Sequence, residues 1–285
     1  MRAAVLGSTG MAGHMIALYL EEKGFDVFRI SRSEKDTEKS KAIDAAKFQE
    51  LADYLDSIHC DVIINCIGLL QKACEERHDL AVLINSYLPH YLEEKYKDSK
   101  TRIVHLSTDC VFSGDRGGYL ETDLPDGRSY YDRTKALGEI INNKDLTFRM
   151  SVIGPDIDEN GTGLLNWFMK QTGTVYGYTN VIWNGITTLQ LAKCIIPALT
   201  NNVTGLYHLV PDAGICKYDL LSMFNEKLRQ NRIKIVGRES DRLNRTLVNT
   251  HRNFIFDIAD YQNQMNDLNA WMKEHSRIYP RYYVT

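Results

Sequence analysis

A tyrosine and a lysine spaced four residues apart, Tyr131 and Lys135, are the side chains of this chain best suited to proton transfer. On a helix, residues at this spacing share a face, so the ammonium can lie near the phenol. A free tyrosine has a pKa of about 10, and a neighbouring cation lowers that pKa toward a useful range. Tyr130 competes for the role, but only Tyr131 has a lysine at the fourth following position.

A hydroxyl side chain follows a short apolar run upstream of this pair. Ser107, Thr108 and Asp109 come directly after residues 103–106, which we predict to be a strand. Ligands of open α/β sheets bind at the carboxyl ends of strands, so Thr108 can hydrogen-bond the substrate oxygen that Tyr131 protonates. The predicted catalytic residues are therefore Thr108, Tyr131 and Lys135.

A glycine-rich turn near the start of the chain predicts a dinucleotide site. The run Gly7-Ser-Thr9-Gly10-Met11-Ala-Gly13 lies between the first predicted strand and a helix. Glycines at this spacing let backbone N–H groups approach a pyrophosphate, which the helix N-terminus then faces. The spacing GxxGxxG is typical of the short-chain dehydrogenase version of this turn.

The end of the second predicted strand bears on the choice of cofactor. NAD sites usually carry an acidic residue there, but this sequence has Ser31, Arg32 and Ser33. A guanidinium and two hydroxyls suit a 2′-phosphate, so we expect NADP(H) to be preferred, with NAD(H) as the alternative. Arg32 as a solvated loop cation is the competing interpretation.

The pattern of apolar residues predicts the elements that position these side chains. Short apolar runs alternate with helical patterns, which indicates βαβ units and an α/β fold: a Rossmann-type doubly wound parallel sheet with a smaller C-terminal substrate-binding lobe. Strands are expected at 2–6, 27–30, 61–66, 103–106 and 146–150, and helices at 11–23, 48–57, 80–96, 128–142 and 189–199. Residues 33–41 are expected to be a loop.

The domain limits follow from the same pattern. We expect residues 1–153 to form the NAD(P)-binding domain and 178–204 to return to it, with 154–177 and 205–285 forming the lobe. The run 205–209 suggests one further return to the main sheet.

Composition excludes several classes of protein. The formal net charge is −3, so no footprint for nucleic acid or an anionic membrane is expected. No apolar run approaches the roughly 18 to 20 residues of a membrane span, and we expect a cytoplasmic protein. The six cysteines form no CxxC pair, so neither disulfides nor a metal site is expected.

Two longer segments resemble a known family. Leu106-Ser-Thr-Asp-Cys-Val-Phe-Ser-Gly114 and Tyr131-Asp-Arg-Thr-Lys-Ala-Leu-Gly-Glu139 are similar to the dTDP-4-dehydrorhamnose reductases, which are extended short-chain dehydrogenases. The resemblance covers roughly residues 1–225. It implies hydride transfer from NAD(P)H to the C4 ketone of a nucleotide-linked 4-keto-6-deoxysugar. In that reaction Thr108 orients the carbonyl, Tyr131 gives the proton, and Lys135 binds the cofactor ribose.

The resemblance also implies further contacts. Along the cofactor we expect Asn65, Cys66, Ile67 and Gly68, with Asn85 supporting Lys135 through water. On the side of the nucleotide-diphosphate sugar we expect Asp109, Cys110, Val111, Asn166, Trp167, Trp183, Asn184 and, for the diphosphate, Arg245. The family commonly has tyrosine at Cys110 and glycine at Asp132, which leaves the sugar and the base open.

Two other functions fit the same residues. An epimerase of the same class would return its hydride to the substrate, and a non-catalytic NADP-binding regulator would keep only the fold. A dehydratase would need a Glu after Asp109, which this chain lacks. A homodimer is left open.

Overall fold

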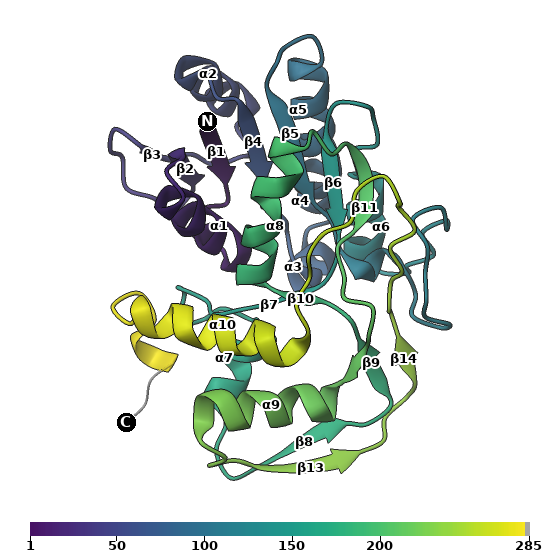
Figure 1. Ribbon diagram of the computed structural model, residues 1–285. Helices are drawn as coiled ribbons and strands as arrows, with labels where there is room; N and C mark the ends of the chain where they lie inside the picture. Colours follow the sequence, from purple (N-terminus) through teal and green to yellow (C-terminus); the bar gives the residue numbers. More distant parts are fainter. Residues whose placement is uncertain (283–285) are drawn as a thin grey trace.

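A parallel sheet of seven strands forms the centre of the computed structural model, which describes residues 1–282 (Figure 1). The strand order is β11-β6-β5-β4-β1-β2-β3, with every neighbouring pair parallel. Their bounds are β1 Arg2–Leu6, β2 Asp26–Ser31, β3 Ser40–Ala42, β4 Val62–Asn65, β5 Arg102–Leu106, β6 Leu146–Arg149 and β11 Gly205–His208. The predicted Rossmann-type sheet is confirmed.

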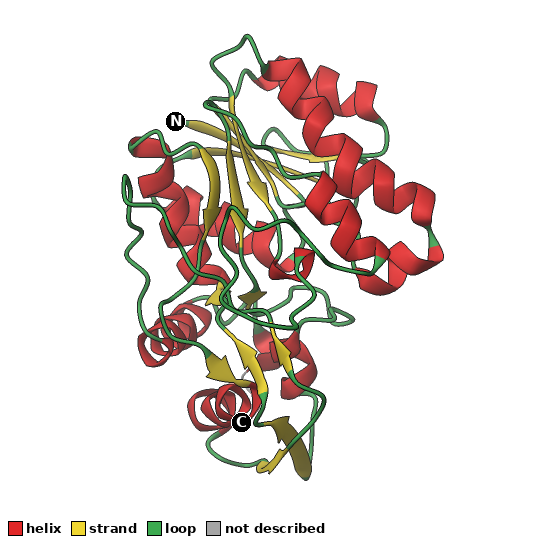
Figure 2. Cartoon of the chain, turned by 90° about the vertical axis from the view of Figure 1, so that its right-hand side faces the viewer, coloured by secondary structure: helices red, strands yellow, loops and turns green. Residues whose placement is uncertain are grey.

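Helices cover both faces of this sheet, as the view toward its edge shows (Figure 2). One apolar cluster joins the sheet to α1 (Met11–Glu22) and α8 (Thr188–Thr200). The opposite cluster contains side chains of α2 (Phe48–Ile58) and α5 (Leu88–Tyr96). Because the central strands are buried on both faces, they appear in the sequence as continuous apolar runs such as Val-Ile-Ile in β4.

Three predicted elements differ from the structure. The predicted loop 33–41 ends in β3, which pairs with β2. The predicted helix 80–96 begins earlier and consists of α4 (His78–Ala81), the π-helical turn η1 (Val82–Tyr87) and α5. The predicted helix 128–142 is only α6 (Tyr130–Leu137), because a capping box between Ser129 and Asp132 begins it and Gly138 ends it.

The smaller lobe lies below the carboxyl ends of the strands in Figure 1. It contains α7 (Leu164–Met169), α9 (Lys217–Arg229) and α10 (Tyr261–Glu274), and short strands that pair as β13 (Lys234–Arg238) with β8 (Thr174–Tyr178), and as β12 (Ile215–Cys216) with β9 (Val181–Trp183) and β14 (Leu243–Asn244). A further pair, β7 (Val152–Ile153) and β10 (Ile186–Thr187), joins the two parts of the molecule.

The division of the chain differs from the expected one. Strand β11 lies in the main sheet beside β6, so residues 205–208 do not belong to the lobe. Strand β9 pairs with lobe strands, so residues 181–183 do not return to the main sheet. The return of the run 205–209 to the main sheet is confirmed, whereas β9 is too short for sequence periodicity to tell which sheet it joins.

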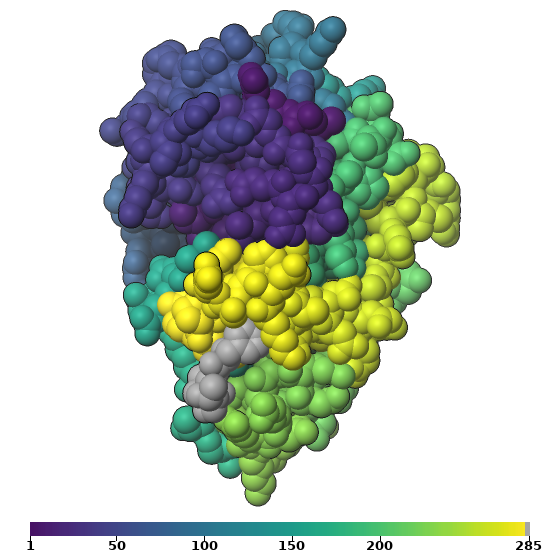
Figure 3. Space-filling view, turned by 60° about the vertical axis from the view of Figure 1, so that its left-hand side comes forward, coloured from purple at the N-terminus to yellow at the C-terminus, as the bar shows by residue number. Residues whose placement is uncertain are grey.

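The C-terminal segment packs between the lobe and the N-terminal domain (Figure 3). The Nε2 atom of His275 lies 2.5 Å from a carboxylate oxygen of Glu22 at the end of α1. The Tyr279 hydroxyl lies 2.9 Å from Nε2 of the buried His14 on the same helix. Helix α1 is therefore held by the sheet on one side and by the end of the chain on the other.

Close contact between Gly13 and Gly7 sets the shape of the turn between β1 and α1. A Cβ atom on Gly13 would lie 2.1 Å from the Gly7 carbonyl oxygen, so no side chain fits there. We expect Gly13→Ala to destabilise the fold by about 1 to 3 kcal/mol, because the helix must move off the turn. Alanine would otherwise stabilise an ordinary helix position by about 1 kcal/mol, so the sign of the effect is diagnostic.

Urea unfolding measures this effect. Gly68→Ala is the control, because its Cβ atom would meet nothing nearer than 3.7 Å. A stability gain in Gly13→Ala would show that the close contact does not exist.

Candidate active site

The predicted hydroxyl residue lies just past the carboxyl end of β5. Thr108 is buried, its hydroxyl accepts the backbone N–H of Cys110 at 3.1 Å and it donates to a carboxylate oxygen of Asp109 at 3.2 Å. These bonds hold its side chain at the start of a short 3-10 turn, Asp109–Val111. Thr108 is therefore fixed beside the first turn of α6.

Tyr131 lies in that first turn of α6. The capping box positions it: the Ser129 hydroxyl accepts the Asp132 N–H at 3.1 Å, and the Asp132 carboxylate accepts the Ser129 N–H at 3.1 Å. Burial raises the pKa of Tyr131, and so does the charge of Cys110, while a hydrogen bond with Thr108 works in the opposite direction. The competing Tyr130 stacks on His78, with the ring centroids 3.5 Å apart.

Lys135 is buried one helical turn further on, with its amine turned toward β5. The Nζ atom donates to the carbonyl oxygen of Leu106 at 2.7 Å and lies 3.3 Å from Nε2 of His105. Burial lowers the pKa of Lys135 to about 8, and Glu139 partly opposes this shift. The three predicted catalytic side chains thus lie together where β5 ends, with the lysine bonded to the strand.

A buried ion pair next to these residues supports this arrangement. The Arg149 guanidinium on β6 donates two hydrogen bonds to the Glu139 carboxylate, at 2.8 and 2.5 Å. The same carboxylate accepts the Ser107 hydroxyl at 2.6 Å. On the other side, Arg149 donates to Nε2 of His208, whose Nδ1 donates to the carbonyl oxygen of Val248. The network links the strand that precedes Thr108 to α6, β11 and the lobe.

The glycine-rich turn lies at the carboxyl end of β1. Gly7 adopts a positive φ of 75°, and its N–H donates to the carbonyl oxygen of Ile30 at 2.7 Å. Thr9 lies 2.9 Å from both the Ser31 and the Ser33 hydroxyls, so the turn and the end of β2 form one hydroxyl cluster. Gly10 is the N-cap of α1, and Met11 is the first residue of that helix.

The charged residues of this region are Arg32 and Glu34. Arg32 is exposed, and within residues 1–282 no protein group hydrogen-bonds its guanidinium. The sequence analysis missed Glu34, whose carboxylate accepts the Ser8 hydroxyl at 2.8 Å. An acidic residue is therefore present beside the glycine-rich turn, a few residues later than the usual NAD position.

The segment after β4 faces the same turn. Asn65 is fully buried and its Oδ1 accepts the N–H of Ile67 at 3.1 Å, which shapes the path through Cys66 toward the exposed Gly68. Asn85 makes no direct hydrogen bond to Lys135. Its Oδ1 accepts the Leu69 N–H at 2.7 Å, and its Nδ2 donates to the Leu69 carbonyl and the Thr134 hydroxyl. Asn85 therefore fastens this segment to α6.

Two cations and one carboxylate meet on the opposite side of Thr108. Arg245 crosses from the lobe, donating from Nε to the carbonyl oxygen of Phe112 at 2.9 Å and from Nη1 to the sulfur of Cys110 at 3.3 Å. Lys217, at the start of α9, lies over the ring of Trp183 at 5.1 Å. Burial raises the pKa of Asp109, and the charges of Arg245 and Lys217 oppose that shift. Lys217 was not among the predicted contact residues.

Four predicted substrate contacts have partners within the protein or are buried. The Asn184 amide binds the backbone of Leu247 through both of its polar atoms. The Asn166 amide donates to the carbonyl oxygen of Gly161 at 2.6 Å. Trp183 packs on Tyr261, and the side chain of Val111 is fully buried. Trp167 alone keeps an exposed ring.

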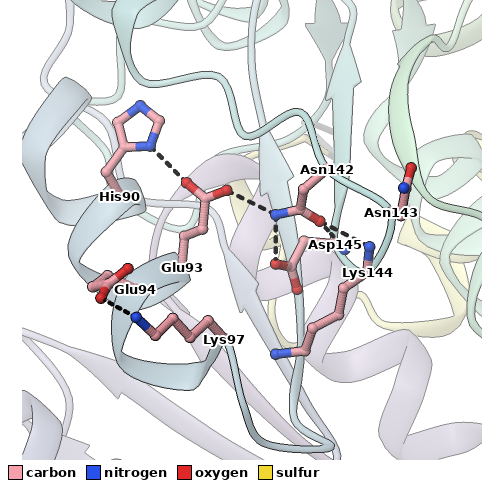
Figure 4. Close-up of a pocket in the computed structure, with 8 residues that line it drawn as sticks. All are labelled: His90, Glu93, Glu94, Lys97, Asn142, Asn143, Lys144 and Asp145. Atoms are coloured by element: carbon pink, nitrogen blue, oxygen red, sulfur yellow. Dashed lines mark hydrogen bonds and ion pairs between the residues drawn. The ribbon is translucent and has the colours of Figure 1, made fainter.

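A surface pocket of about 610 Å³ lies away from this region (Figure 4). It is formed by α5 and the loop before β6, at the edge of the sheet opposite the carboxyl ends of the strands. Its side chains bind one another: Glu93 accepts from Asn142 at 2.7 Å and lies 2.7 Å from Nδ1 of His90. The pocket is thus lined by groups that are already paired.

Two further observations concern the described part of the chain. No group of three or more His, Cys, Asp or Glu side chains among residues 1–282 is placed to hold a metal ion, and the six cysteines are free. Within the same residues, no helix has the length and apolarity needed to cross a membrane.

Comparison with known proteins gives consistent results. The family model described as RmlD substrate binding domain matches residues 1–247. A probable low-salt glycan biosynthesis reductase of Haloferax volcanii is 27% identical, over 80% of this chain and 79% of that protein. A dTDP-4-dehydrorhamnose reductase of Mycobacterium tuberculosis is 28% identical, over 48% of this chain and 44% of its own. A solved dTDP-4-dehydrorhamnose reductase of Bacillus anthracis, in complex with NADP, has a TM-score of 0.81 at 18% identity, covering 95% and 99% of the two chains.

The lowered pKa of Lys135 predicts how stability depends on pH. Between about 8 and the ordinary value of 10.5, the unfolded chain binds a proton that the folded chain has released. The contribution of this lysine to the free energy of unfolding therefore rises with pH across that window. We expect the stability of the wild type relative to Lys135→Met to increase between these two pH values.

Urea unfolding of both proteins at a series of pH values measures the difference. Lys72→Met is the matched control, because the Lys72 side chain is 91% exposed, and its curve should run parallel to that of the wild type. Parallel curves for Lys135→Met as well would show that burial does not depress the pKa of Lys135.

Proposed function

Since the chain belongs to the RmlD substrate binding domain family, we propose that it is a reductase that transfers hydride from NAD(P)H to the C4 ketone of a nucleotide-linked 4-keto-6-deoxysugar. The family resemblance seen in the sequence is thereby confirmed. The observation that carries the proposal is the meeting of Thr108, Tyr131 and Lys135 at the carboxyl end of β5, beside the glycine-rich turn. The names of the relatives, which are reductases, support it.

The arrangement assigns a step to each side chain. A nicotinamide cofactor, when bound, supplies the hydride. Thr108 orients the substrate carbonyl by a hydrogen bond, and Tyr131 donates the proton that the reduced oxygen requires. Burial raises the pKa of Tyr131, so the phenol holds its proton at neutral pH but is a weaker acid than a free tyrosine. Lys135 would contact the cofactor ribose through an N–H of Nζ that is not bonded to β5.

The residues around the glycine-rich turn fit a dinucleotide. The space where a Cβ of Gly13 would stand is filled by the Gly7 backbone, which lets α1 point its N-terminus at a pyrophosphate. Thr9, Ser31 and Ser33 present hydroxyls, and Arg32 offers a guanidinium for a 2′-phosphate. These features favour NADP(H), although Glu34 lies close enough to accept a ribose hydroxyl and would accommodate NAD(H).

The substrate side fits an anionic ligand. Arg245 and Lys217 lie on the lobe and face the residues after Thr108, and both reach the neighbourhood of Cys110. Two cations at this place suit the diphosphate of a dTDP- or UDP-linked sugar. Trp167 keeps an exposed ring that can stack on a base, whereas Asn166, Trp183 and Asn184 serve the lobe itself.

Reduction is tested by a panel of dTDP-, UDP- and GDP-linked 4-keto-6-deoxysugars assayed for NADPH oxidation. We expect one NADPH consumed for each sugar reduced. Tyr131→Phe should lower turnover by roughly 100- to 10,000-fold while cofactor binding persists, because only the proton donor is lost. Tyr130→Phe is the control and should retain full activity.

Two results would reject the reductase. Product formed without net loss of NADPH would favour an epimerase, which returns its hydride to the same sugar. Binding of NADPH without reduction of any sugar in the panel would favour the regulator.

Arg32 provides a test of cofactor preference. We expect Arg32→Ala to weaken the binding of NADPH by roughly 10- to 150-fold and that of NADH hardly at all. Only NADPH has a 2′-phosphate, so only NADPH loses a contact. Fluorescence titration measures both affinities. Lys35→Ala removes an equal charge from the same exposed loop and should change neither. Equal weakening of the two cofactors by Arg32→Ala would refute the assignment.

A further inference from the structure

Three buried polar side chains, one of them the predicted catalytic Lys135, form a chain of contacts between β4 and α6. Asn65 at the end of β4 and His105 on β5 are fully buried, and Lys135 on α6 is 4% exposed. Asn65 Nδ2 lies 3.2 Å from His105 Nδ1, and His105 Nε2 lies 3.3 Å from Lys135 Nζ. At each contact of a buried histidine between an amide and an amine, one hydrogen-bond donor must face one acceptor.

The direction of each hydrogen bond follows from the Asn65 end of this chain. The N–H of Ile67 requires an acceptor, and Asn65 Oδ1 is 3.1 Å away. The Nδ2 group of Asn65 therefore faces His105 and donates to its Nδ1. Burial keeps the pKa of His105 well below its ordinary value, so the ring is neutral and has a single proton. That proton must lie on Nε2, where it points at Lys135.

A proton on Nε2 of His105 demands a particular form of the lysine. An N–H donor needs a lone pair, and Nζ has a lone pair only when the amine is neutral. A neutral amine can accept from His105 and still donate to the Leu106 carbonyl oxygen at 2.7 Å. Asn65, His105, Lys135 and the Leu106 carbonyl then all have a matching hydrogen-bond partner.

The ammonium form of Lys135 cannot be accommodated without changes along the chain of contacts. Three N–H donors on Nζ require His105 to accept at Nε2 and hence to move its proton to Nδ1. That proton would meet Asn65 Nδ2, unless the amide turns over and gives up the bond to Ile67. Charging the lysine therefore breaks one hydrogen bond near the start of the segment 65–68.

We propose that His105 is a positioning residue that couples the charge of Lys135 to the hydrogen bonding of Asn65, and through it to the backbone of residues 65–68. The neutral lysine fixes this segment and the ammonium releases it. The consequence for cofactor binding rests on the proposed function. The coupling itself belongs to the protein alone and needs neither substrate nor cofactor.

Other groups near Lys135 do not replace this path. Glu139, just after α6, favours the ammonium, as do Cys66 after β4 and Cys74 on α3 (Gln71–Glu76). His90 on α5 acts on His105 only through its charge. Of these groups, only Cys66 lies next to Asn65 in the chain, and its thiol points to the Ile64 carbonyl oxygen.

Two other buried histidines provide internal standards. Nδ1 of His14 faces the carbonyl oxygen of Gly10 at 2.9 Å, and Nδ1 of His208 faces that of Val248 at 2.9 Å. Both rings must hold their proton on Nδ1. His105 is the buried histidine whose Nδ1 faces a donor instead.

NMR of protein labelled at histidine and isoleucine tests the coupling. As the pH falls through the Lys135 pKa of about 8, the His105 proton should move from Nε2 to Nδ1, while His14 and His208 keep theirs on Nδ1. The Ile67 amide resonance should shift with the same midpoint. A His105 ring that keeps one tautomer throughout would overturn the proposal.

Variants separate the hydrogen-bonded path from a direct effect of charge. His105→Phe should abolish the Ile67 titration, and His105→Gln, which can donate and accept, should restore part of it. Lys135→Met should remove the titration of both residues. An Ile67 titration that survives unchanged in His105→Phe would overturn the coupling, even if the enzyme proves to be a reductase.

Discussion

The buried ion pair between Arg149 and Glu139 is the interaction that the rest of the site depends on. Both side chains are almost fully buried, so the pair is desolvated and must recover that loss through good geometry and extra hydrogen bonds. It does so through two bonds between the partners, one to Ser107 and one to His208. The pair therefore fixes the distance between β5, which leads to Thr108, and α6, which carries Tyr131 and Lys135.

Sequence patterns predicted the parts of this molecule that depend on neighbours in the chain. Strands β1, β2, β4, β5 and β6, the glycine-rich turn and the Tyr-xxx-Lys spacing are all local signals, and they located these strands and the turn correctly. The limits of α6 were wrong, because Ser129 and Asp132 form a capping box inside the predicted helix and Gly138 packs against the Asn85 backbone. A helical pattern shows neither feature.

Contacts between distant residues were beyond sequence reasoning. Asn85, expected to support Lys135 through water, bonds directly to Leu69 and Thr134. Glu34 reaches Ser8 across the end of β2, and Lys217 reaches the region of Asp109 from the lobe. Nothing in the types or spacing of these residues distinguishes a partner across the fold from a solvated surface group. His105 was likewise hidden, because a histidine within an apolar run reads as an ordinary core residue.

The contacts of His275 and Tyr279 with α1 bear on the order in which the parts of the protein can fold. Helix α1 precedes the other described helices in the chain, yet its His14 contacts Tyr279 and its Glu22 contacts His275, more than 250 residues later. The outer strand β11 of the main sheet also comes late in the chain, after α7, β8 and β9 of the lobe. The Rossmann half is therefore unfinished during most of translation, with the apolar surface of α1 that faces α8 still uncovered. The glycine-rich turn and α1 therefore reach their final packing only when residues 275 and 279 are present.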